Sequence, residues 1–421
     1  MRFANLVALA NRGICLALFL RSSSASNIPR AQPGEDPVLV IDTFTNGGRN
    51  DLDAWHGGGE DMPVEWGYGF VEFSPTNADQ NFHTQLTSTC YDLNPYKDMY
   101  LHIVCQGGSH FTVSLSQNNP QCDAFKNPYP ETWDDVEAHR YMKDNDVYIP
   151  ISHFNIDYTR ALSVSFKGFY LDEKLKVSKV EITATRPENF PAPKKLPTGS
   201  LWKRCKRPNS FAFGIDDGSL ELGRQMMDIL TAEGINATFF TVGNGLAAPN
   251  SGWTNLYKDM LAHGHQVALH SWSHPPIEEL KTDAEIDEDI IKNIQIVREQ
   301  LGFESRYFRP PYGILGARTR QRLARLIKDP QIINWSVDIE DWLWVGSPTP
   351  EKQVEAFQRD VDKGGDLVVM HFLSKDTVMY TKDFIQIARN TGKRIMRVDQ
   401  CMEDPARHPL IRASVIIDSQ P

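Results

Sequence analysis

Two adjacent carboxylates follow an apolar run near the middle of the 421-residue chain. The run is Phe211 to Ile215, and Asp216, Asp217 and Gly218 come directly after it. Neighbouring anions repel each other, and burying either one is costly unless a cation or a hydrogen-bond donor stabilises it. Asp-Gly is also a common turn dipeptide. This stretch alone fits a solvated turn as well as an active site, so the remaining residues have to distinguish the two.

Two histidines follow a second apolar run and form a candidate metal site with one of these carboxylates. His270 and His274 lie in HSWSHPP, after the run QVAL. Pro275 disfavours α-helical geometry at His274, so a turn at a strand end has to bring both rings to one ion. With Asp217 they offer two imidazoles and one carboxylate, which suit Zn²⁺, Co²⁺ or a similar divalent ion and leave one position open for water. The sequence therefore predicts a site for one divalent ion, with Zn²⁺ as the leading candidate.

Two further histidines precede the same run and are expected to be structural. His263 and His265 come before residues 266–269, and His270 comes after them. A strand rises by about 3.3 Å per residue, so these rings should lie at the opposite end of the strand. We interpret them as turn residues.

More titratable and aromatic residues come directly after other predicted strands. They are Arg309 and Tyr312 in RPPYG, Asp338, Asp341 and Trp342 in DIEDW, and His371 at the end of LVVMH. In folds built from alternating strands and helices, reactive groups collect where the parallel strands end. Core packing alone hardly explains such a series, so the sequence predicts an active site at one rim of the sheet.

The elements that have to position these residues alternate between strand and helix from about Cys205 onwards. Predicted strands such as FAFGI, ATFFTVG and DLVVMHF are each followed by helical segments, among them 317–327 and the long run that begins at DAEIDED. This alternation predicts a parallel sheet with barrel-like closure, over residues 205–402.

Residues 37–186 have a different pattern, with short strands rich in β-branched and aromatic residues. Among them are WGYGFVEF, MYLHIVC, FTVSLSQ and ALSVSFKGFYL, separated by Gly, Asn, Asp and Pro. The pattern predicts an antiparallel β-sandwich of jelly-roll type. A proline-bearing linker is expected at 187–204 and a C-terminal tail at 403–421.

The ends and the composition of the chain suggest an extracellular protein. Residues 1–26 contain Arg2, Arg12, a short apolar run and the small-residue stretch SSSAS, as in a secretory signal peptide. No other segment is apolar enough to cross a membrane. The net charge of −10 argues against a nucleic-acid partner. We expect a secreted protein, associated with the cell wall or free, and a monomer.

Five of the six cysteines would remain after signal cleavage. The runs MYLHIVC and FTVSLSQ are predicted to form a hairpin that turns near Gly108, which carries Cys122 back towards Cys90 and away from Cys105. We therefore expect a Cys90–Cys122 disulfide, with Cys105 left as a small apolar residue. The other two, Cys205 and Cys401, flank the second domain and are expected to form a bridge that ties its ends together.

Five short stretches of the chain follow one another in a telling order: GIDDGS, HSWSH, RPPYG, DIEDW and LVVMH. The polysaccharide deacetylases with a NodB homology domain (carbohydrate esterase family four) have their five motifs in the same order. The chain therefore resembles that family over residues 205–400. The phrase HSWSHPPIEEL is most similar to fungal chitin deacetylases. The resemblance implies a distorted (β/α) barrel that removes acetyl groups from N-acetylglucosamine polymers. It does not cover the predicted sandwich.

The resemblance also implies a role for each motif residue. Asp216 would be the general base, held in its charged state by Arg309, and Asp217, His270 and His274 would bind the metal. The backbone N–H of Tyr312 would stabilise the oxyanion. His371 would be the general acid, oriented by Asp341. Substrate contacts are expected at Trp342 and Leu367, which would wall the acetyl pocket, and at Tyr312 and Trp272.

Four positions depart from the family pattern. Gly214 and Ile215 replace the usual Thr-Phe, Ser219 replaces a Pro, and Phe372 replaces a common Asp. None of them removes a reacting group, so they leave specificity and loop shape open more than activity.

Several alternatives remain open at this point. The leading interpretation is a secreted chitin or chito-oligosaccharide N-deacetylase; the others are an O-acetyl esterase on xylan, a deacetylase of another aminosugar polymer, and a non-catalytic wall-binding protein. The sandwich is either a carbohydrate-binding module, with Trp55, Trp66, Tyr129 and Trp133 as candidate sugar platforms, or a spacer. Asn236, in NATF, matches a glycosylation acceptor, and Asn334, in an apolar strand, is expected to stay unmodified.

Overall fold

The structure, a computed structural model, describes residues 39–171 and 173–404. The expected signal peptide at 1–26 and nearly all of the expected tail at 403–421 lie outside the described residues. All described residues belong to one compact unit. No helix in the described ranges is both long enough and apolar enough to span a bilayer.

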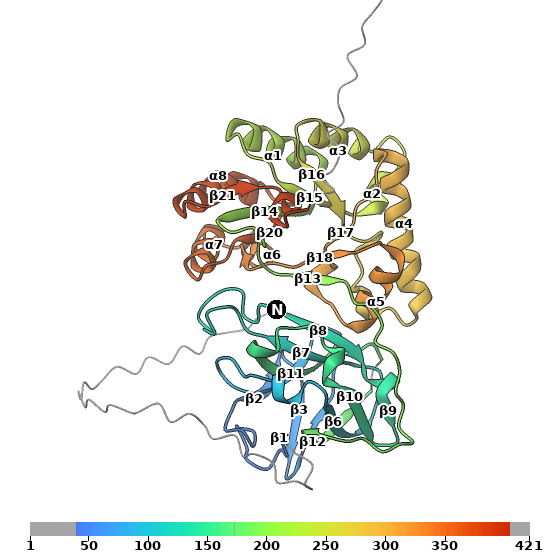
Figure 1. Cartoon of the computed structure of the whole chain (residues 1–421). Coiled ribbons are helices and arrows are strands. Elements are labelled where there is room, and N and C mark those ends of the chain that lie inside the picture. The colour runs from blue at the N-terminus through green and yellow to red at the C-terminus, as the bar shows by residue number, and fades with distance from the viewer. Residues whose placement is uncertain (1–38, 172, 405–421) are drawn as a thin grey trace, which may run out of the picture. The chain divides into compact units, whose positions relative to one another are not determined.

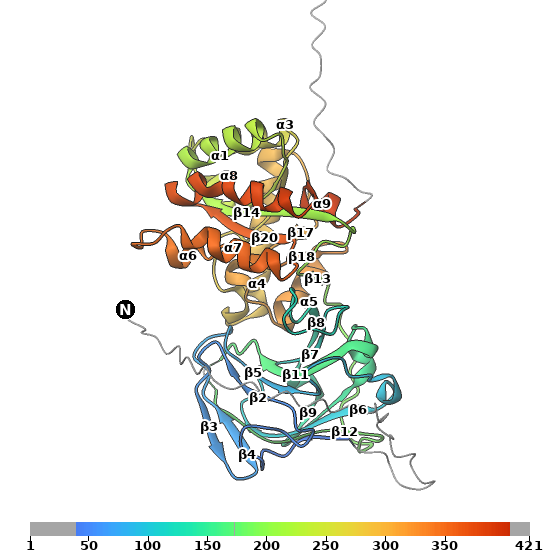
Figure 2. The same ribbon diagram turned by 90° about the vertical axis from the view of Figure 1, so that its left-hand side faces the viewer.

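Residues 39–183, here called the β-domain, contain two antiparallel sheets (Figure 2). The first has the order β3-β4-β12-β6-β10-β9, with β1 paired to β12. Its strands are β1 (Leu39–Asp42), β3 (Val64–Gly67), β4 (Phe70–Phe73), β6 (Tyr100–Gly107), β9 (Met142–Lys143), β10 (Asp146–Pro150) and β12 (Leu175–Thr183). The second has the order β2-β5-β11-β7-β8. Its strands are β2 (His56–Gly59), β5 (Asn81–Gln85), β7 (Thr112–Gln117), β8 (Thr132–Glu137) and β11 (Ala161–Lys167).

The two sheets share one apolar core because alternate side chains of their strands point inward. In β5 the second and fourth residues are buried and their neighbours are partly exposed. Phe73 of the first sheet meets Phe82 and Phe166 of the second, with ring centroids 4.7 and 5.6 Å apart. Period-two alternation therefore identifies this region as strands, as the sequence predicted.

Two local predictions in the β-domain are wrong. The run at 66–73 is not one strand, because the chain turns at Gly69, whose φ of 77° suits glycine, and forms β3 and β4. The predicted hairpin of MYLHIVC with FTVSLSQ does not form either. β6 pairs with β10 and β12 in the first sheet, whereas β7 pairs with β8 and β11 in the second. Alternation marks each run as a strand but does not identify its partner.

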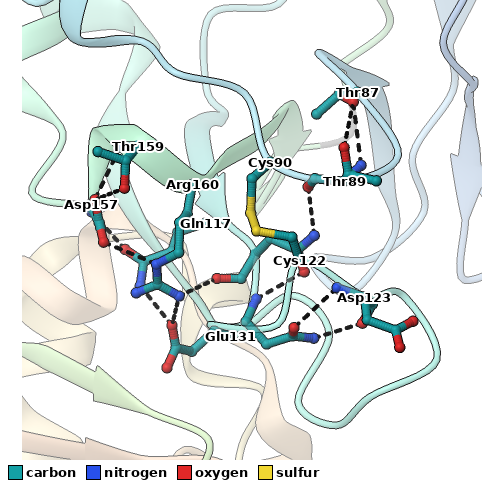
Figure 3. The surroundings of a disulfide bond; sticks show 12 residues. Thr87, Thr89, Cys90, Gln117, Cys122, Asp123, Glu131, Asp157, Thr159 and Arg160 are labelled. Carbon is teal, nitrogen blue, oxygen red and sulfur yellow. Dashed lines mark hydrogen bonds and ion pairs between the residues drawn. A yellow bond between two sulfur atoms is a disulfide. The ribbon is translucent and has the colours of Figure 1, made fainter. Parts of the chain in front are cut away.

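The Cys90–Cys122 disulfide is nevertheless confirmed, for a different reason (Figure 3). β5 and β7 are both antiparallel to β11, so they run in the same direction and their C-terminal ends lie at one edge. Cys90 follows β5 and Cys122 follows β7, and Asn118 Nδ2 donates to Thr89 O across the gap at 2.5 Å. Cys105 is a buried free thiol in the core of the β-domain, as predicted.

Residues 200–404, here called the α/β-domain, form a nine-stranded sheet with helices around it (Figure 1). The sheet has the order β13-β18-β17-β16-β15-β14-β20-β19, with β21 paired to β14, and all its strand pairs are parallel. Its strands are β13 (Ser200–Trp202), β14 (Ser210–Gly218), β15 (Thr238–Thr241), β16 (Gln266–Leu269), β17 (Tyr307–Phe308), β18 (Gln331–Ile333), β19 (Val337–Asp338), β20 (Leu367–Phe372) and β21 (Arg394–Met396). Among the described strands β13 and β19 end the order without pairing to each other, so the curled sheet fits a distorted barrel that does not close.

The helices of this domain follow the strands as the alternation predicted. They are α1 (Leu220–Ala232), α2 (Gly243–Ala247), α3 (Trp253–Ala262), α4 (Asp283–Leu301), α5 (Ala317–Leu326), α6 (Asp341–Trp344), α7 (Lys352–Asp362), α8 (Lys375–Asn390) and α9 (Val398–Cys401). Local sequence sets their ends: α4 begins with a capping box between Thr282 and Glu285 and ends at Gly302 in the left-handed conformation. The segment 187–204 is not only a linker, since β13 within it belongs to the sheet. The Cys205–Cys401 disulfide is present and ties the two ends of the domain together.

A buried polar contact joins the β-domain to the α/β-domain. Arg320 of α5 lies 2.7 Å from Asp135 of β8, and their side chains are 3% and 0% exposed. The backbone N–H of Ala317 donates to Thr112 Oγ1 at 2.9 Å. Helix α5 is therefore fixed at its beginning and along its length by β-domain residues.

Candidate active site

The paired carboxylates lie at the C-terminal end of β14, where the strand register shifts. Asp216 pairs with His371 of β20, and Gly218 pairs with Phe372, so Asp217 is the extra residue of a bulge. A bulge re-aims side chains that would otherwise alternate between the two faces of a strand. Asp216 is accordingly buried, at 2% exposure, while the side chain of Asp217 remains 28% exposed. The two carboxylates therefore lie in different environments although they are adjacent in the sequence.

Arg309 stabilises the buried carboxylate. Its Nη1 lies 2.6 Å from Asp216 Oδ1, and its remaining donors bind Ile333 O and Val368 O at 3.2 and 3.0 Å. Burial alone would raise the pKa of Asp216, but the charges of Arg309, His270 and His371 lower it below its usual value. Asp216 is therefore a buried carboxylate that nearby positive charges keep in its ionised form.

The predicted metal ligands converge on one point. Both His270 Nε2 and His274 Nε2 lie 3.7 Å from Asp217 Oδ1. Two atoms bound to one ion about 2.1 Å away can be up to roughly 4.2 Å apart, so these spacings suit a single ion. Asp217 Oδ1 is buried without a hydrogen-bond partner, which is costly unless a cation binds it. These three residues form the candidate metal group among the described residues.

The tautomer and charge of His270 suit a ligand role. Its Nδ1 lies 2.8 Å from Arg309 O and has to donate to that carbonyl, so its Nε2 lone pair faces the candidate site. Burial also lowers the pKa of His270. The neutral imidazole, which is the form that binds metals, is therefore favoured.

Another carboxylate, which the sequence analysis did not single out, holds the loop that carries the two histidines. Asp289 of α4 accepts from the backbone N–H groups of Trp272 and Ser273 at 2.8 and 3.2 Å and from Ser273 Oγ at 2.8 Å. Ser271 and His274 have φ values of 69° and 58°, a conformation that non-glycine residues rarely adopt. Asp289 therefore stabilises a strained loop at the candidate site. The run of acidic residues in this helix gave no sign of which one faces inward.

His371 and Asp341 form a hydrogen-bonded pair on the other side of the site. Asp341 Oδ1 lies 2.9 Å from His371 Nδ1, and Asp341 Oδ2 accepts from the backbone N–H of His371 at 2.8 Å. Burial alone would lower the pKa of His371, but the hydrogen bond and charge of Asp341, with the charges of Asp216 and Asp217, raise it to about 9. His371 is therefore protonated at neutral pH and can donate a proton.

Tyr312 lines the site from a strained turn. Its φ is 60° and its ψ is 5° within the short turn Pro311–Gly313. The neighbouring N–H groups of Gly313 and Ile314 bind Pro310 O and Pro311 O, whereas the Tyr312 N–H has no such partner among the described residues. The ring packs edge-on against His274, with centroids 4.7 Å apart. The turn thus leaves this N–H without a backbone partner in the described part of the chain and packs the ring against one of the candidate metal ligands.

These groups line one cavity of about 540 Å³. Its walls include nine residues that the sequence analysis singled out: Asp216, Asp217, His270, His274, Tyr312, Asp338, Asp341, Trp342 and His371. Trp342 is 72% exposed at the beginning of α6. Arg309 lies behind the wall, fully buried, where it contacts Asp216. The volume is in the range of small-molecule sites.

Two predicted substrate contacts lie elsewhere. Leu367 is fully buried in the core at the beginning of β20, and Val369, two residues further along the same strand face, lines the cavity in its place. Trp272 packs against the main core cluster and does not line the cavity. The motif LVVMH identifies the strand β20 correctly, but it does not show which residue of that strand lines the cavity.

The structure also adds cavity residues that the sequence did not indicate. Trp335, Val345 and Leu373 contribute apolar walls, and Asp79 comes from the β-domain. Asp79 is 137 positions before Asp216, and nothing in the sequence connects the two.

The departures from the family pattern have local explanations. A Cβ at Gly214 would lie 2.3 Å from Arg309 Nη2, so glycine is required for this position of the guanidinium. Ser219 accepts from the Leu222 N–H and caps α1, a role that proline cannot take. Phe372 is fully buried and lies against Gly218, where a Cβ would be 2.3 Å from its ring.

Comparisons with known proteins show what this chain is similar to. Residues 203–327 match the family model described as polysaccharide deacetylase. The chain is 30% identical to a peptidoglycan-N-acetylglucosamine deacetylase, PgdA, of Listeria monocytogenes over 57% of this chain and 48% of that protein. It is 27% identical to a chitin deacetylase of Colletotrichum lindemuthianum over 51% of this chain and 87% of that protein. The chain thus spans about half the length of the first of these relatives.

One solved structure is also similar to this chain. The structure of the chitin deacetylase from Colletotrichum lindemuthianum matches with 27% identity and a TM-score of 0.46, over 50% of this chain and 95% of that one. Residues 203–327 thus match the polysaccharide deacetylase model, and the chain is similar to deacetylases over this part of the α/β-domain.

Proposed function

We propose that this protein is a secreted, metal-dependent N-deacetylase that hydrolyses the acetamide groups of N-acetylglucosamine polymers, chitin or chito-oligosaccharides foremost, and releases acetate. The single observation that carries the proposal is the convergence of Asp217, His270 and His274 beside an ionised Asp216 and a protonated His371 in one cavity. Amide hydrolysis needs an activated water, a stabilised oxyanion and a proton donor for the amine, and these residues supply all three.

The metal triad accounts for the electrophilic part of the reaction. A divalent ion held by Asp217, His270 and His274 would lower the pKa of a water and polarise the amide carbonyl. Zn²⁺ fits this donor set, and Co²⁺ also accepts it. The orphaned Asp217 Oδ1 favours a bound cation.

The protein's own groups account for the proton transfers. Asp216 accepts the proton of the attacking water, and Arg309 keeps this carboxylate ionised. The free N–H of Tyr312 donates to the oxyanion that develops on the former carbonyl oxygen. His371 donates its Nε2 proton to the departing amine, while Asp341 fixes the ring through Nδ1.

The walls of the cavity position the acetyl group. Trp342, Val345 and Leu373 offer exposed apolar surface beside His371. We propose that Trp342 contacts the acetyl methyl, with Val369 in the place expected of Leu367.

The location and the β-domain belong to the same proposal. Two disulfides, a secretory-like N-terminus and a likeness to fungal chitin deacetylases support an extracellular protein.

We further propose that the β-domain is a jelly-roll-type sandwich that binds carbohydrate. Trp55 and Trp66 are 47% and 45% exposed and can stack on sugar rings. Trp133 is a poorer platform, because Lys167 and Lys203 cover its ring at 3.9 and 5.5 Å, and Tyr129 is partly buried and hydrogen-bonded to Gln85.

Glycosylation at Asn236 also remains a proposal. Its side chain is partly exposed just before β15 and donates to His263 O at 2.9 Å. Asn334 is 7% exposed, which opposes modification there.

Acetate release from defined substrates tests the proposed activity. Chitopentaose, acetylated xylan and peptidoglycan, each incubated with the purified metal-loaded protein, separate N-deacetylation of chitin from the ester and peptidoglycan alternatives. Elemental analysis should find one divalent ion per chain, and His274→Ala should lose it. Release of acetate only from xylan would make the protein an esterase. A chain that binds chitin but releases acetate from none of the three would be a binding protein.

A further inference from the structure

One loop of the β-domain reaches into the cavity of the α/β-domain. Asp79, between β4 and β5, lines the same cavity as Asp216, His274 and Tyr312. The deacetylase motifs lie entirely within residues 205–400, so this carboxylate is an addition that the second domain alone does not supply.

The loop is held in place at several points. Asn77 Oδ1 accepts from the backbone N–H groups of Asp79 and Gln80, each at 3.0 Å. Gln80 is 5% exposed and binds Thr76 N through its Oε1 at 2.7 Å. The Ala78 N–H donates to Glu279 Oε1 of the α/β-domain at 2.9 Å. Asp79 therefore has a defined position at the cavity wall.

The charge of Asp79 is not balanced by a nearby cation. In the part of the chain that the structure describes, no Lys, Arg or His nitrogen lies within 4.0 Å of its carboxylate. Lys167 acts on it only at longer range, and that ammonium is held over Trp133 and 3.8 Å from Asp135. Desolvation in the cleft, together with the charges of Glu60 and Glu279, raises the pKa of Asp79 to about 6. The negative potential at this wall favours a cationic ligand.

The proposed reaction itself produces such a ligand. Each acetate that is released leaves a free amine on the polymer, and a facing carboxylate favours its protonated form. The next N-acetyl sugar of the same polymer then enters the cavity with a cationic neighbour. A neutral, fully acetylated polymer offers Asp79 only hydroxyl groups.

We infer that Asp79 forms a subsite for the ammonium group of a glucosamine unit next to the sugar that is deacetylated, so that the enzyme prefers partly deacetylated substrate. This inference rests on the proposed deacetylase function. It gives the β-domain a role in specificity, by contributing a charged group to a cavity whose chemistry belongs to the α/β-domain.

The test compares binding and turnover in matched variants at pH 7 in low salt. Asp79→Asn should weaken the binding of glucosamine pentamer, measured by calorimetry with the full chain, by about fivefold, the size of a partly exposed ion pair. The ratio of kcat/KM for partly deacetylated to fully acetylated oligomer should fall by a similar factor. Glu65→Gln removes the same charge from an exposed position of β3 and should change neither quantity. Added salt should remove most of the difference between wild type and Asp79→Asn.

The outcomes separate this inference from the proposed function. If the wild-type protein binds the glucosamine pentamer better than Asp79→Asn but releases no acetate, the deacetylase proposal is wrong and the subsite is supported. If the protein releases acetate but wild type and Asp79→Asn bind the pentamer equally, the inference that Asp79 forms a subsite is wrong. Loss of binding in Asp79→Ala with full binding in Asp79→Asn would also overturn it, because Asp79 would then recognise a hydroxyl group and not an ammonium.

Discussion

This molecule contains two buried arginine–aspartate pairs. They differ in the contacts of the aspartate oxygen that does not bind the arginine. Arg309 and Asp216 lie 2.6 Å apart and Arg320 and Asp135 lie 2.7 Å apart, and no side chain of either pair is more than 3% exposed. The first pair borders the cavity, and the second joins the β-domain to the α/β-domain. Burial and contact distance therefore do not tell a functional pair from a structural one.

The surroundings of the free oxygen do distinguish them. Asp135 uses Oδ2 for Arg320 and Oδ1 for the hydroxyl of Ser114, so both of its oxygens are satisfied. Asp216 uses Oδ1 for Arg309, but its Oδ2 lies 3.7 Å from His270 Nε2, beyond hydrogen-bond distance, and faces the cavity. We call the Arg320–Asp135 pair closed, because both carboxylate oxygens have partners, and it stabilises the fold. We call the Arg309–Asp216 pair open, because it leaves one ionised oxygen available to accept a proton.

The largest effect is expected from Asp216→Asn. Asparagine keeps the shape and can still accept from Arg309, but it cannot take a proton from water. Acetate release should fall by about 1,000-fold, the scale of a lost general base. Bound metal, measured by elemental analysis, should stay at one ion per chain because Asp216 is not in the ligand triad.

Asp228→Asn, on the exposed face of α1, serves as the control and should retain full activity. Turnover by Asp216→Asn within tenfold of wild type would remove the distinction between the open and the closed pair.

The next effect concerns stability and the closed pair. Arg320→Met should lower the free energy of unfolding by about 3 kcal/mol or more, because it leaves Asp135 buried without its arginine. Thermal unfolding measures this loss, and the folded fraction should retain its turnover. Arg325→Met in the same helix removes an exposed guanidinium, 67% accessible, and should change stability little.

The same substitution in the open pair sharpens the contrast. Arg309→Met should abolish acetate release, since the pKa of Asp216 would rise without the guanidinium. If Arg320→Met abolished turnover of the folded protein as well, the two pairs would not be functionally different.

The pH dependence of activity tests the proton donor opposite Asp216. His371 has a pKa raised to about 9 and acts as an acid only while protonated, so kcat should be sustained below pH 9 and fall as the pH rises through it. Asp341→Asn removes the hydrogen-bonded charge that contributes most to the increase, so the basic limb should move to lower pH, by about one unit for each 1.4 kcal/mol lost. An unchanged basic limb in Asp341→Asn would show that another group donates the proton.

Much of the site could be predicted from the sequence because its chemistry is local. Each motif places its polar residues directly after an apolar strand, and parallel strands bring their C-terminal ends to one rim. Asp216, Asp217, His270, His274 and His371 were predicted in this way to lie together, and they line one cavity.

The missed features depend on long-range packing. Alternation could not assign β6 and β7 to different sheets, and it could not show that Val369 rather than Leu367 reaches the cavity. Asp79 and Asp289 were also missed: one comes from another domain and the other is one acid among many in α4. The disulfide of Cys90 with Cys122 was predicted correctly although the hairpin behind it was wrong, because β5 and β7 end at the same edge.

Asp289 resembles neither arginine pair, because it binds backbone and hydroxyl donors of a strained loop. Asp289→Asn replaces one of its two acceptor oxygens by a donor, so the loop that carries His270 and His274 should lose part of its support. Zn²⁺ affinity, measured by competition with a chelator, should weaken by about tenfold, the usual scale for groups that orient metal ligands. Glu288→Gln, on the exposed face of the same helix, is the matched control. Equal Zn²⁺ affinity in wild type and Asp289→Asn would mean that the positive φ angles at Ser271 and His274 are maintained by the sheet and not by this carboxylate.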